Sequence, residues 1–306
     1  MSFLHFTVTV IFFAISSILP LYTLAYFHLI FSARKYRKSS TKSLDDYPVV
    51  TVQLPIYNER YVVGRLLESV CMLDYPRDKL QIIVVDDSDD ETAEICGKLV
   101  EHYRSLGYWI MHLRRGSRAG YKAGALQEAL KHSRGEFIAI FDADFAPPRD
   151  FLKKALQHFT SDDIGLVQAR WGHLNRDYSA LTAAQALSLD LHFKIEQAGR
   201  NASGLFINFN GTAGVWRKKC IEDSGGWLPS LAEDLDLSYR AQLRGWRLVY
   251  IDDLEAPAEL PVQMNASRRQ QYRWAFGSFQ TALRYVPEIL AAKISALTKI
   301  HAVIHL

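Results

Sequence analysis

Short apolar runs alternate with amphipathic segments between residues 49 and 285. Continuous apolar runs of this length predict strands that are buried on both faces of a sheet. Segments with the apolar spacing of a helix lie between these runs. Helices are expected to begin near Val62, Glu91 and Ala232, to end at Lys131 after the loop from Gly116, and to extend over Thr182–Ala198. Strands that alternate with helices predict an open, mostly parallel α/β sheet flanked by helices. The strands are expected at Val49–Leu54, Leu80–Val85, Trp109–Leu113, Phe137–Phe141 and Ile164–Trp171, with another from Phe206 that carries a glycine-flanked tip at Asn210–Gly214.

A much longer apolar run opens the chain. No Lys, Arg, Asp or Glu occurs from Phe3 to Phe31, and roughly 20 apolar residues suffice to span a bilayer. Basic residues follow this run instead of preceding it, which favours a retained anchor over a cleavable signal peptide and predicts an outside N-terminus with the remainder in the cytoplasm. We therefore expect a transmembrane anchor over residues 1–33 and a basic, polar linker over 34–48 at the cell membrane. The basic residues are Arg34, Lys35, Arg37, Lys38 and Lys42.

The C-terminal segment is also mostly apolar. Pro287 to Leu306 carries Lys293 and Lys299 about two helical turns apart. This pattern predicts an amphipathic helix on the membrane surface, or the entry to a further span. Because the sequence stops inside the apolar run, we expect a truncated chain, with one domain over 49–285 and a membrane-proximal segment over 286–306.

Composition narrows the class of protein. The 306 residues include 36 Lys and Arg against 33 Asp and Glu, and 49% are hydrophobic. Such a chain is neither disordered nor a strongly basic nucleic-acid binder, so no nucleic-acid partner is expected. The three cysteines lack CxxC spacing, which indicates reduced thiols of a cytosolic domain, and no Cys/His cluster has zinc spacing. Three Asn-x-Ser/Thr patterns are read as coincidence, because a cytoplasmic domain does not meet the glycosylation machinery.

Polar side chains follow three of the expected strands. Asp142 and Asp144 come just after the apolar run from Phe137, Asp86 and Asp87 follow the second strand, and Tyr57-Asn58-Glu59 follows the first. Ligands of open α/β sheets bind outside the carboxyl ends of the strands, so these groups are expected to converge on one edge. Carboxylates suit Mg²⁺ or Mn²⁺. A lone Asp-x-Asp pair is a weak signal, since ordinary turns contain it too, and Asp86–Asp90 could equally cap a helix.

A basic loop lies in the same half of the chain. The segment GSRAGYKAGAL from Gly116 holds Arg118 and Lys122, which could meet a phosphate directly. It has neither the P-loop spacing nor the GxGxxG spacing of a dinucleotide fold. Together with the acidic strand ends it outlines a nucleotide-diphosphate site.

The second half supplies further candidates. Glu233 and Asp234 fall in the first turn of an expected helix, where capping and catalysis are both open and capping is favoured from the residues alone. Asp236 nearby is interpreted as a surface residue. Arg273 and Trp274 suit diphosphate or sugar contact, because Arg binds phosphate through two hydrogen bonds and Trp stacks on sugar faces.

Taken in order, these residues resemble the membrane-bound family 2 glycosyltransferases of the cellulose synthase and glucomannan synthase group. The resemblance covers about Val49 to Tyr285. Four motifs carry it: Asp86-Asp87, Asp142-Ala-Asp144, Ala232-Glu233-Asp234 where the family usually has threonine first, and Gln270-x-x-Arg273-Trp274. The sequence segments GYKAGAL, FNGTAGVWR and EDLDLSYRAQLRGW are similar to those of the mannan and glucan synthase-like branch.

The resemblance implies a GT-A type fold and inverting transfer of a hexose from a nucleotide-diphosphate sugar to an acceptor hydroxyl. It implies Asp234, with Glu233, as the catalytic pair and Asp142 with Asp144 as the ligands of Mg²⁺ or Mn²⁺. The donor is implied to be UDP-glucose first and GDP-mannose second, and the product a β-glucan or mannan polysaccharide. Donor-binding residues are implied to be Tyr57, Glu59, Asp86, Asp87, Lys122, Asp142 and Arg273, and acceptor-binding residues Gln270 and Trp274.

Two other functions stay open. A non-processive transferase could add one sugar to a membrane lipid, and the single anchor with its basic, amphipathic C-terminus favours this. A catalytically inactive scaffold would have lost the metal or base carboxylates, and the sequence retains all of them.

Overall fold

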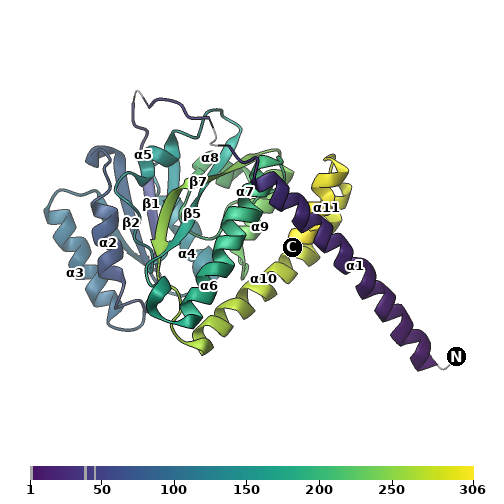
Figure 1. Cartoon of the computed structure of the whole chain (residues 1–306). Coiled ribbons are helices and arrows are strands. Elements are labelled where there is room, and N and C mark those ends of the chain that lie inside the picture. Colours follow the sequence, from purple (N-terminus) through teal and green to yellow (C-terminus); the bar gives the residue numbers. More distant parts are fainter. Residues whose placement is uncertain (1–2, 38–39, 45) are drawn as a thin grey trace.

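The computed structural model describes residues 3–37, 40–44 and 46–306, so Lys38, Ser39 and Asp45 of the expected linker lie outside the described residues. A 31-residue helix, α1 (Phe3–Ala33), opens the chain and projects away from the globular body (Figure 1). Among the described residues, no helix combines the length and the apolar character needed to cross a membrane. The expected span is therefore helical, but its role as a membrane anchor is not confirmed.

Seven strands form one sheet in the order β3-β2-β1-β4-β6-β5-β7. All neighbours pair in parallel except at β6, which is antiparallel to both β4 and β5. This confirms the predicted mostly parallel sheet. The strands are β1 (Val50–Ile56), β2 (Leu80–Asp86), β3 (Ile110–Arg114), β4 (Phe137–Ile140), β5 (Ile164–His173), β6 (Gly214–Arg217) and β7 (Arg247–Ala258).

Helices cover both faces of this sheet. Alternate residues of β4 divide between the two cores, with Phe137 and Ala139 in one and Ile138 and Ile140 in the other. The period of two along a strand sends successive side chains to opposite faces. The first core includes α2 (Val63–Cys71), α3 (Thr92–Ser105) and α5 (Phe151–Leu156), and the second includes α4 (Tyr121–His132), α8 (Lys218–Asp223) and α9 (Glu233–Leu243).

The strand expected from Phe206 to Trp216 forms only at its end, as β6, and the prediction is wrong over Phe206 to Asn210. The structure has irregular backbone there, and only β6 follows it. The backbone N–H groups of this segment donate to side chains instead of a neighbouring strand: Ile207 to Gln242, Phe209 to Ser238 and Asn210 to Gln168. The buried backbone N–H groups of this apolar segment are therefore hydrogen-bonded although no strand pairs with it.

The long helical pattern from Thr182 divides into three segments. They are α6 (Ala180–Leu191), a π-helical turn η3 (His192–Gln197) and α7 (Ala198–Ala202). Single π turns inside helices often mark functional sites.

Two helices end the chain. The first, α10 (Met264–Ala291), continues through Pro287, and the second, α11 (Ala296–His305), begins after a short break. The single C-terminal helix expected from Pro287 is therefore two segments. Residues of α9, α10 and α11 share a small core that includes Tyr239, Ile289 and Ala302.

Candidate active site

The sheet register brings the acidic strand ends to one edge. Gln53 of β1 pairs with Ile140 of β4, and Ile56 pairs with Asp86 of β2. Because β6 runs antiparallel, its first residue, Gly214, pairs with Ile140. The loop before β6 therefore lies beside the end of β4, where the backbone N–H of Asp142 donates to Thr212 Oγ1 at 2.9 Å.

Lys122 connects two pairs of carboxylates at this edge. It lies in the first turn of α4, and its Nζ is 2.5 Å from Asp142 Oδ1 and 3.8 Å from Glu233 Oε1. Burial alone would lower the pKa of Lys122, but the carboxylates of Asp142, Glu233 and Asp234 outweigh it and raise the pKa. The ammonium group is therefore held charged between Asp142 and the acidic start of α9.

Gly211 closes the space between these groups. Its carbonyl accepts a hydrogen bond from Lys122 Nζ at 3.0 Å. A Cβ on Gly211 would lie 3.2 Å from Asp234 Oδ2 and 3.4 Å from Lys122 Nζ, and its φ of +81° favours glycine. The glycine tip expected from the sequence is thus part of the charged cluster.

Glu233 and Asp234 occupy the first turn of α9, as expected. Asp234 Oδ1 accepts the backbone N–H of the next residue, Leu235, at 2.8 Å. Burial, and to a smaller extent Asp234, raise the pKa of Glu233 to about 7 against the opposing charge of Lys122. The pKa of Asp234 is raised too, chiefly by burial. Glu233 is therefore poised to hold or accept a proton near neutral pH, and Asp234 holds a proton more readily than an exposed aspartate.

The edge has more negative charge than its lysine balances. Burial, then the carboxylate of Asp142, raise the pKa of Asp144 to about 7. Partial desolvation, then Asp142, also raise the pKa of Glu59. The part of each rise that comes from the neighbouring carboxylate indicates that positive charge is short at this edge. Asp142 and Asp144, as hard oxygen ligands, therefore fit a divalent cation such as Mg²⁺ or Mn²⁺.

Asp87 is fixed by a residue that the sequence did not single out. Arg115 makes a bidentate pair with the Asp87 carboxylate through Nε and Nη2, and both side chains are nearly buried. The same guanidinium donates to the backbone oxygens of Ala119 and Tyr121. Arg115 thereby ties the end of β2 to the basic loop, which places Lys122.

Asp86 is fully buried and paired inside the protein. Its Oδ2 lies 2.8 Å from His112 Nε2, and its Oδ1 accepts the backbone N–H of Ser88 at 2.8 Å. These hydrogen bonds outweigh the opposing effect of burial and lower its pKa. Cys96 lies close to this pair, so three possible ligand atoms fall within 4.8 Å of one another although their sequence spacing showed no such group.

Tyr57 stands at the mouth of this region. The Arg118 guanidinium lies 3.2 Å from the centroid of its ring. A flat cation stacked on an aromatic ring forms a preorganised platform. Asn58 fixes the same turn by hydrogen bonds to the loop after β2, including one to Asp89 at 2.7 Å.

The motif on α10 is more open. Gln270 is half-buried and Arg273 is exposed. Trp274 is 36% exposed, and its ring centroid lies 6.4 Å from that of Trp171. Trp171 packs in turn on Phe145, directly after Asp144. An aromatic path therefore runs from α10 to the end of β4.

Asp236 is not the surface residue that the sequence indicated. It is 1% exposed and accepts hydrogen bonds from Arg240, Arg284 and Tyr285. It therefore holds α10 against α9, and with it the position of the Gln270–Trp274 motif. No local signal distinguished it from Asp234, since only the packing of α10 buries it.

Comparisons with known proteins assign the chain to a family. The model of the glycosyltransferase-like family 2 matches residues 48–277. A probable glucomannan 4-beta-mannosyltransferase from Oryza sativa subsp. japonica is 43% identical over 262 residues, which are 83% of this chain and 46% of the relative. The chain thus spans about half the length of that relative.

Solved structures share the fold. The mannosyltransferase PcManGT from Pyrobaculum calidifontis, in complex with GDP-Man and Mn²⁺, superposes with a TM-score of 0.74 at 23% identity, over 93% of this chain and 76% of the other. TarS residues 1–349 from S. aureus, in complex with UDP, gives a TM-score of 0.60 at 19% identity, over 83% and 69%. The match of the family model over most of the chain, with the 43% identical relative, shows that this chain belongs to the glycosyltransferase-like family 2.

Proposed function

We propose that this family 2 glycosyltransferase is an inverting hexosyltransferase that moves a mannosyl group from GDP-mannose to a growing β-mannan or glucomannan chain. One observation carries the proposal: Lys122 joins the Asp142 carboxylate to the Glu233-Asp234 pair. A candidate ligand of the metal that would bind the diphosphate and a candidate base thus lie on either side of one ammonium group, which suits displacement at the sugar carbon between them.

The leaving diphosphate is the first requirement of this reaction. Asp142 and Asp144 would hold Mg²⁺ or Mn²⁺, which supplies charge neutralisation for the diphosphate when bound. Lys122 adds a fixed positive charge at the same place, and Arg273 on α10 would add a second. Donor binding would also use the platform of Tyr57 and the loop behind Asp86 and Asp87, with Glu59 at the rim.

The acceptor hydroxyl must lose a proton as it attacks. Asp234 would take that proton, because burial raises its pKa and makes it a stronger base than an exposed aspartate. Glu233 would share the negative charge and position the first turn of α9. Trp274, backed by Trp171, would stack on the acceptor sugar, and Gln270 would hydrogen-bond it.

The donor sugar is inferred from the relatives. The 43% identical relative bears a mannosyltransferase name, and the structure of PcManGT holds GDP-Man with Mn²⁺. These names favour mannose over the glucose that the sequence resemblance placed first. UDP-glucose stays the second candidate.

A donor screen tests this function. The full chain in detergent micelles would be incubated with labelled GDP-mannose or UDP-glucose and a mannan oligosaccharide, with Mn²⁺, Mg²⁺ or chelator. We expect transfer from GDP-mannose with either metal and none with chelator. Transfer from UDP-glucose alone would overturn the mannose assignment, and metal-independent transfer would overturn the role of Asp142 and Asp144.

We also propose that α1 holds the enzyme at a membrane, with its N-terminus outside. Support comes from the apolar side chains exposed along the helix, among them Phe6, Phe12, Phe13, Leu19 and Leu24. This position favours a second candidate, transfer of a single sugar to a membrane lipid. Sizing the product after lipid extraction separates the two, since a polymer grows with time and a glycolipid does not.

A further inference from the structure

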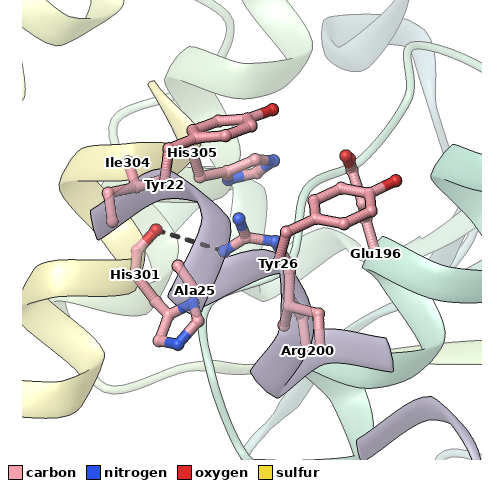
Figure 2. Close-up of a pocket in the computed structure, with 9 residues that line it drawn as sticks. Tyr22, Ala25, Tyr26, Glu196, Arg200, His301, Ile304 and His305 are labelled. Carbon is pink, nitrogen blue, oxygen red and sulfur yellow. Dashed lines mark hydrogen bonds between the residues drawn. The ribbon is translucent and has the colours of Figure 1, made fainter. Parts of the chain in front are cut away.

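A polar cavity of about 90 Å³ lies where α1 meets the body of the protein. Its walls come from α1, from the η3–α7 segment and from α11 (Figure 2). It shares no residue with the charged cluster around Lys122. The polar groups in its lining are Tyr22, Tyr26, Glu196, Arg200, His301 and His305.

Arg200 is a buried cation without a carboxylate partner. It is 3% exposed, its guanidinium donates to the backbone oxygen of His301 at 3.2 Å, and its Nε has no hydrogen-bond partner. In the part of the chain that the structure describes, no carboxylate lies close enough to the Arg200 guanidinium to form an ion pair. Glu196 pairs with His192 instead, at 2.9 Å. Glu196 lines the same cavity and stabilises the charge of Arg200 without a direct ion pair. Burying a charge that has no directly paired counter-charge is costly, so an anion in the cavity would stabilise Arg200.

The histidines in the wall add possible donors. His301 is 2% exposed, and its Nδ1 has no partner, while its Nε2 bonds to His28 Nδ1 at 2.9 Å. The ring of His305 bonds to the hydroxyl of Tyr239 through Nδ1 at 2.9 Å. Arg200 and His301, which each have one nitrogen without a hydrogen-bond partner, therefore both line the same small cavity.

Helix packing keeps this cavity open. Gly199, next to Arg200, lies against the backbone of Leu29, where a Cβ would collide with the Leu29 carbonyl. Ala25, one turn earlier on α1, presents only a methyl group to the cavity. The helices thus approach closely at Gly199 and leave a space beside Ala25. Tyr22, about half exposed, stands at its mouth.

We propose that this cavity binds a phosphate group, with Arg200 as its principal ligand. The guanidinium is suited to phosphate because it donates two parallel, charge-assisted hydrogen bonds. A volume of 90 Å³ far exceeds the ~10–15 Å³ that one water needs, and so admits a group of phosphate size. The phosphate would belong either to a free anion or to the head group of a lipid beside α1.

Calorimetry on the full chain in phosphate-free, non-ionic detergent tests the first source. Titrated inorganic phosphate is expected to bind wild type and to bind Arg200→Gln about tenfold or more weakly, because the variant loses the charge-assisted hydrogen bonds of the guanidinium. Arg34→Gln removes the same charge from an exposed position on the chain just after α1, and it should leave binding unchanged. Ala25→Leu narrows the cavity from the opposite wall without touching Arg200, and it should also weaken binding.

Vesicle flotation tests the lipid source. Phosphatidylcholine vesicles with phosphatidic acid should retain wild type better than phosphatidylcholine alone, and Arg200→Gln should lose more of that difference than Arg34→Gln. Binding of inorganic phosphate assigns the cavity to a free anion, and selective loss on vesicles assigns it to a lipid. If neither probe responds to Arg200→Gln or Ala25→Leu, or if both arginine variants lose binding equally, the proposal is wrong. Sugar transfer from GDP-mannose by Arg200→Gln is measured in parallel, as the control that this variant is folded.

Discussion

Lys122 and Arg200 each place a positive charge away from bulk water, and their surroundings are opposite. Around Lys122, three carboxylates outweigh the effect of burial and raise its pKa. Around Arg200, burial dominates and lowers its pKa, with Glu196 and the tyrosines too weak to reverse it. The first site has an excess of negative charge and suits a metal cation. At the second, no carboxylate of the described residues forms an ion pair with the buried guanidinium, which leaves a position for an anion. The comparison indicates that the groups beside a buried cation, more than the cation itself, determine which ligand its surroundings can accept.

Asp234→Asn tests the acidic side of this comparison with the largest expected effect. Losing the base should lower turnover by about 10²–10⁴-fold, while donor affinity, which depends on Asp142 and Lys122, should change little. Turnover and GDP-mannose binding would be measured separately. Asp163→Asn, an exposed carboxylate paired with Arg247, is the matched control and should retain activity. Wild-type turnover in Asp234→Asn would show that Asp234 is not the catalytic base.

Lys122→Met and Arg200→Met should separate the two cations by stability. Removing Lys122 leaves buried carboxylates uncompensated and should lower the free energy of unfolding by about 3–5 kcal/mol. Removing Arg200 in phosphate-free buffer deletes a charge that already lacks a partner, so the change should stay within about 1 kcal/mol. Urea unfolding of the full chain in detergent measures both, with exposed Lys131→Met as the control. An Arg200→Met variant as unstable as Lys122→Met would mean that the protein itself supplies the anion.

More of the acidic site around Lys122 than of the cavity around Arg200 could be predicted from the sequence. The strand ends at Asp86 and Asp142 could be found because buried parallel strands are continuous apolar runs, and their carboxyl ends share an edge. The partner of Asp87 could not, since Arg115 reaches it only through the sheet register of β2 and β3. Arg200 was missed for a related reason. It lies just past the helical pattern expected over Thr182–Ala198, and only the packing of α1 and α11 against α7 buries it.

A similar limit explains the segment before β6. Its apolar residues have strand propensity, but their N–H groups bond to Gln168, Ser238 and Gln242, which are distant in sequence. Such tertiary hydrogen bonds override local propensity. The consequence is functional, because the irregular backbone leads into the tip where Gly211 contacts Lys122.

The pH dependence of stability should be opposite in the two regions, and Glu233 tests the acidic one. Its pKa is raised from 4.5 to about 7, so the folded state keeps a proton that the unfolded chain loses. The free energy of unfolding should therefore fall as pH rises from about 4.5 to about 7, by up to about 3 kcal/mol. Glu233→Gln should flatten this slope in chelator-treated protein, and exposed Glu68→Gln should not. Identical slopes in wild type and Glu233→Gln would show that Glu233 ionises normally.

His301 should give the smaller effect, with the reverse sign. Burial, then the charge of Arg200 and the ring of His28, lower its pKa from 6.5 to about 4. The unfolded chain takes up this proton first, so the stability contributed by neutral His301 is complete above about pH 6.5 and is lost as pH falls toward 4. Between about pH 7 and 5 the expected loss is about 2 kcal/mol, and His301→Gln should remove it. Added phosphate should reduce the loss in wild type, because an anion beside Arg200 lets His301 carry a proton at lower cost; the same phosphate should have no effect in Arg200→Gln. A slope that phosphate leaves unchanged in wild type would place the anion, if one binds, away from this histidine.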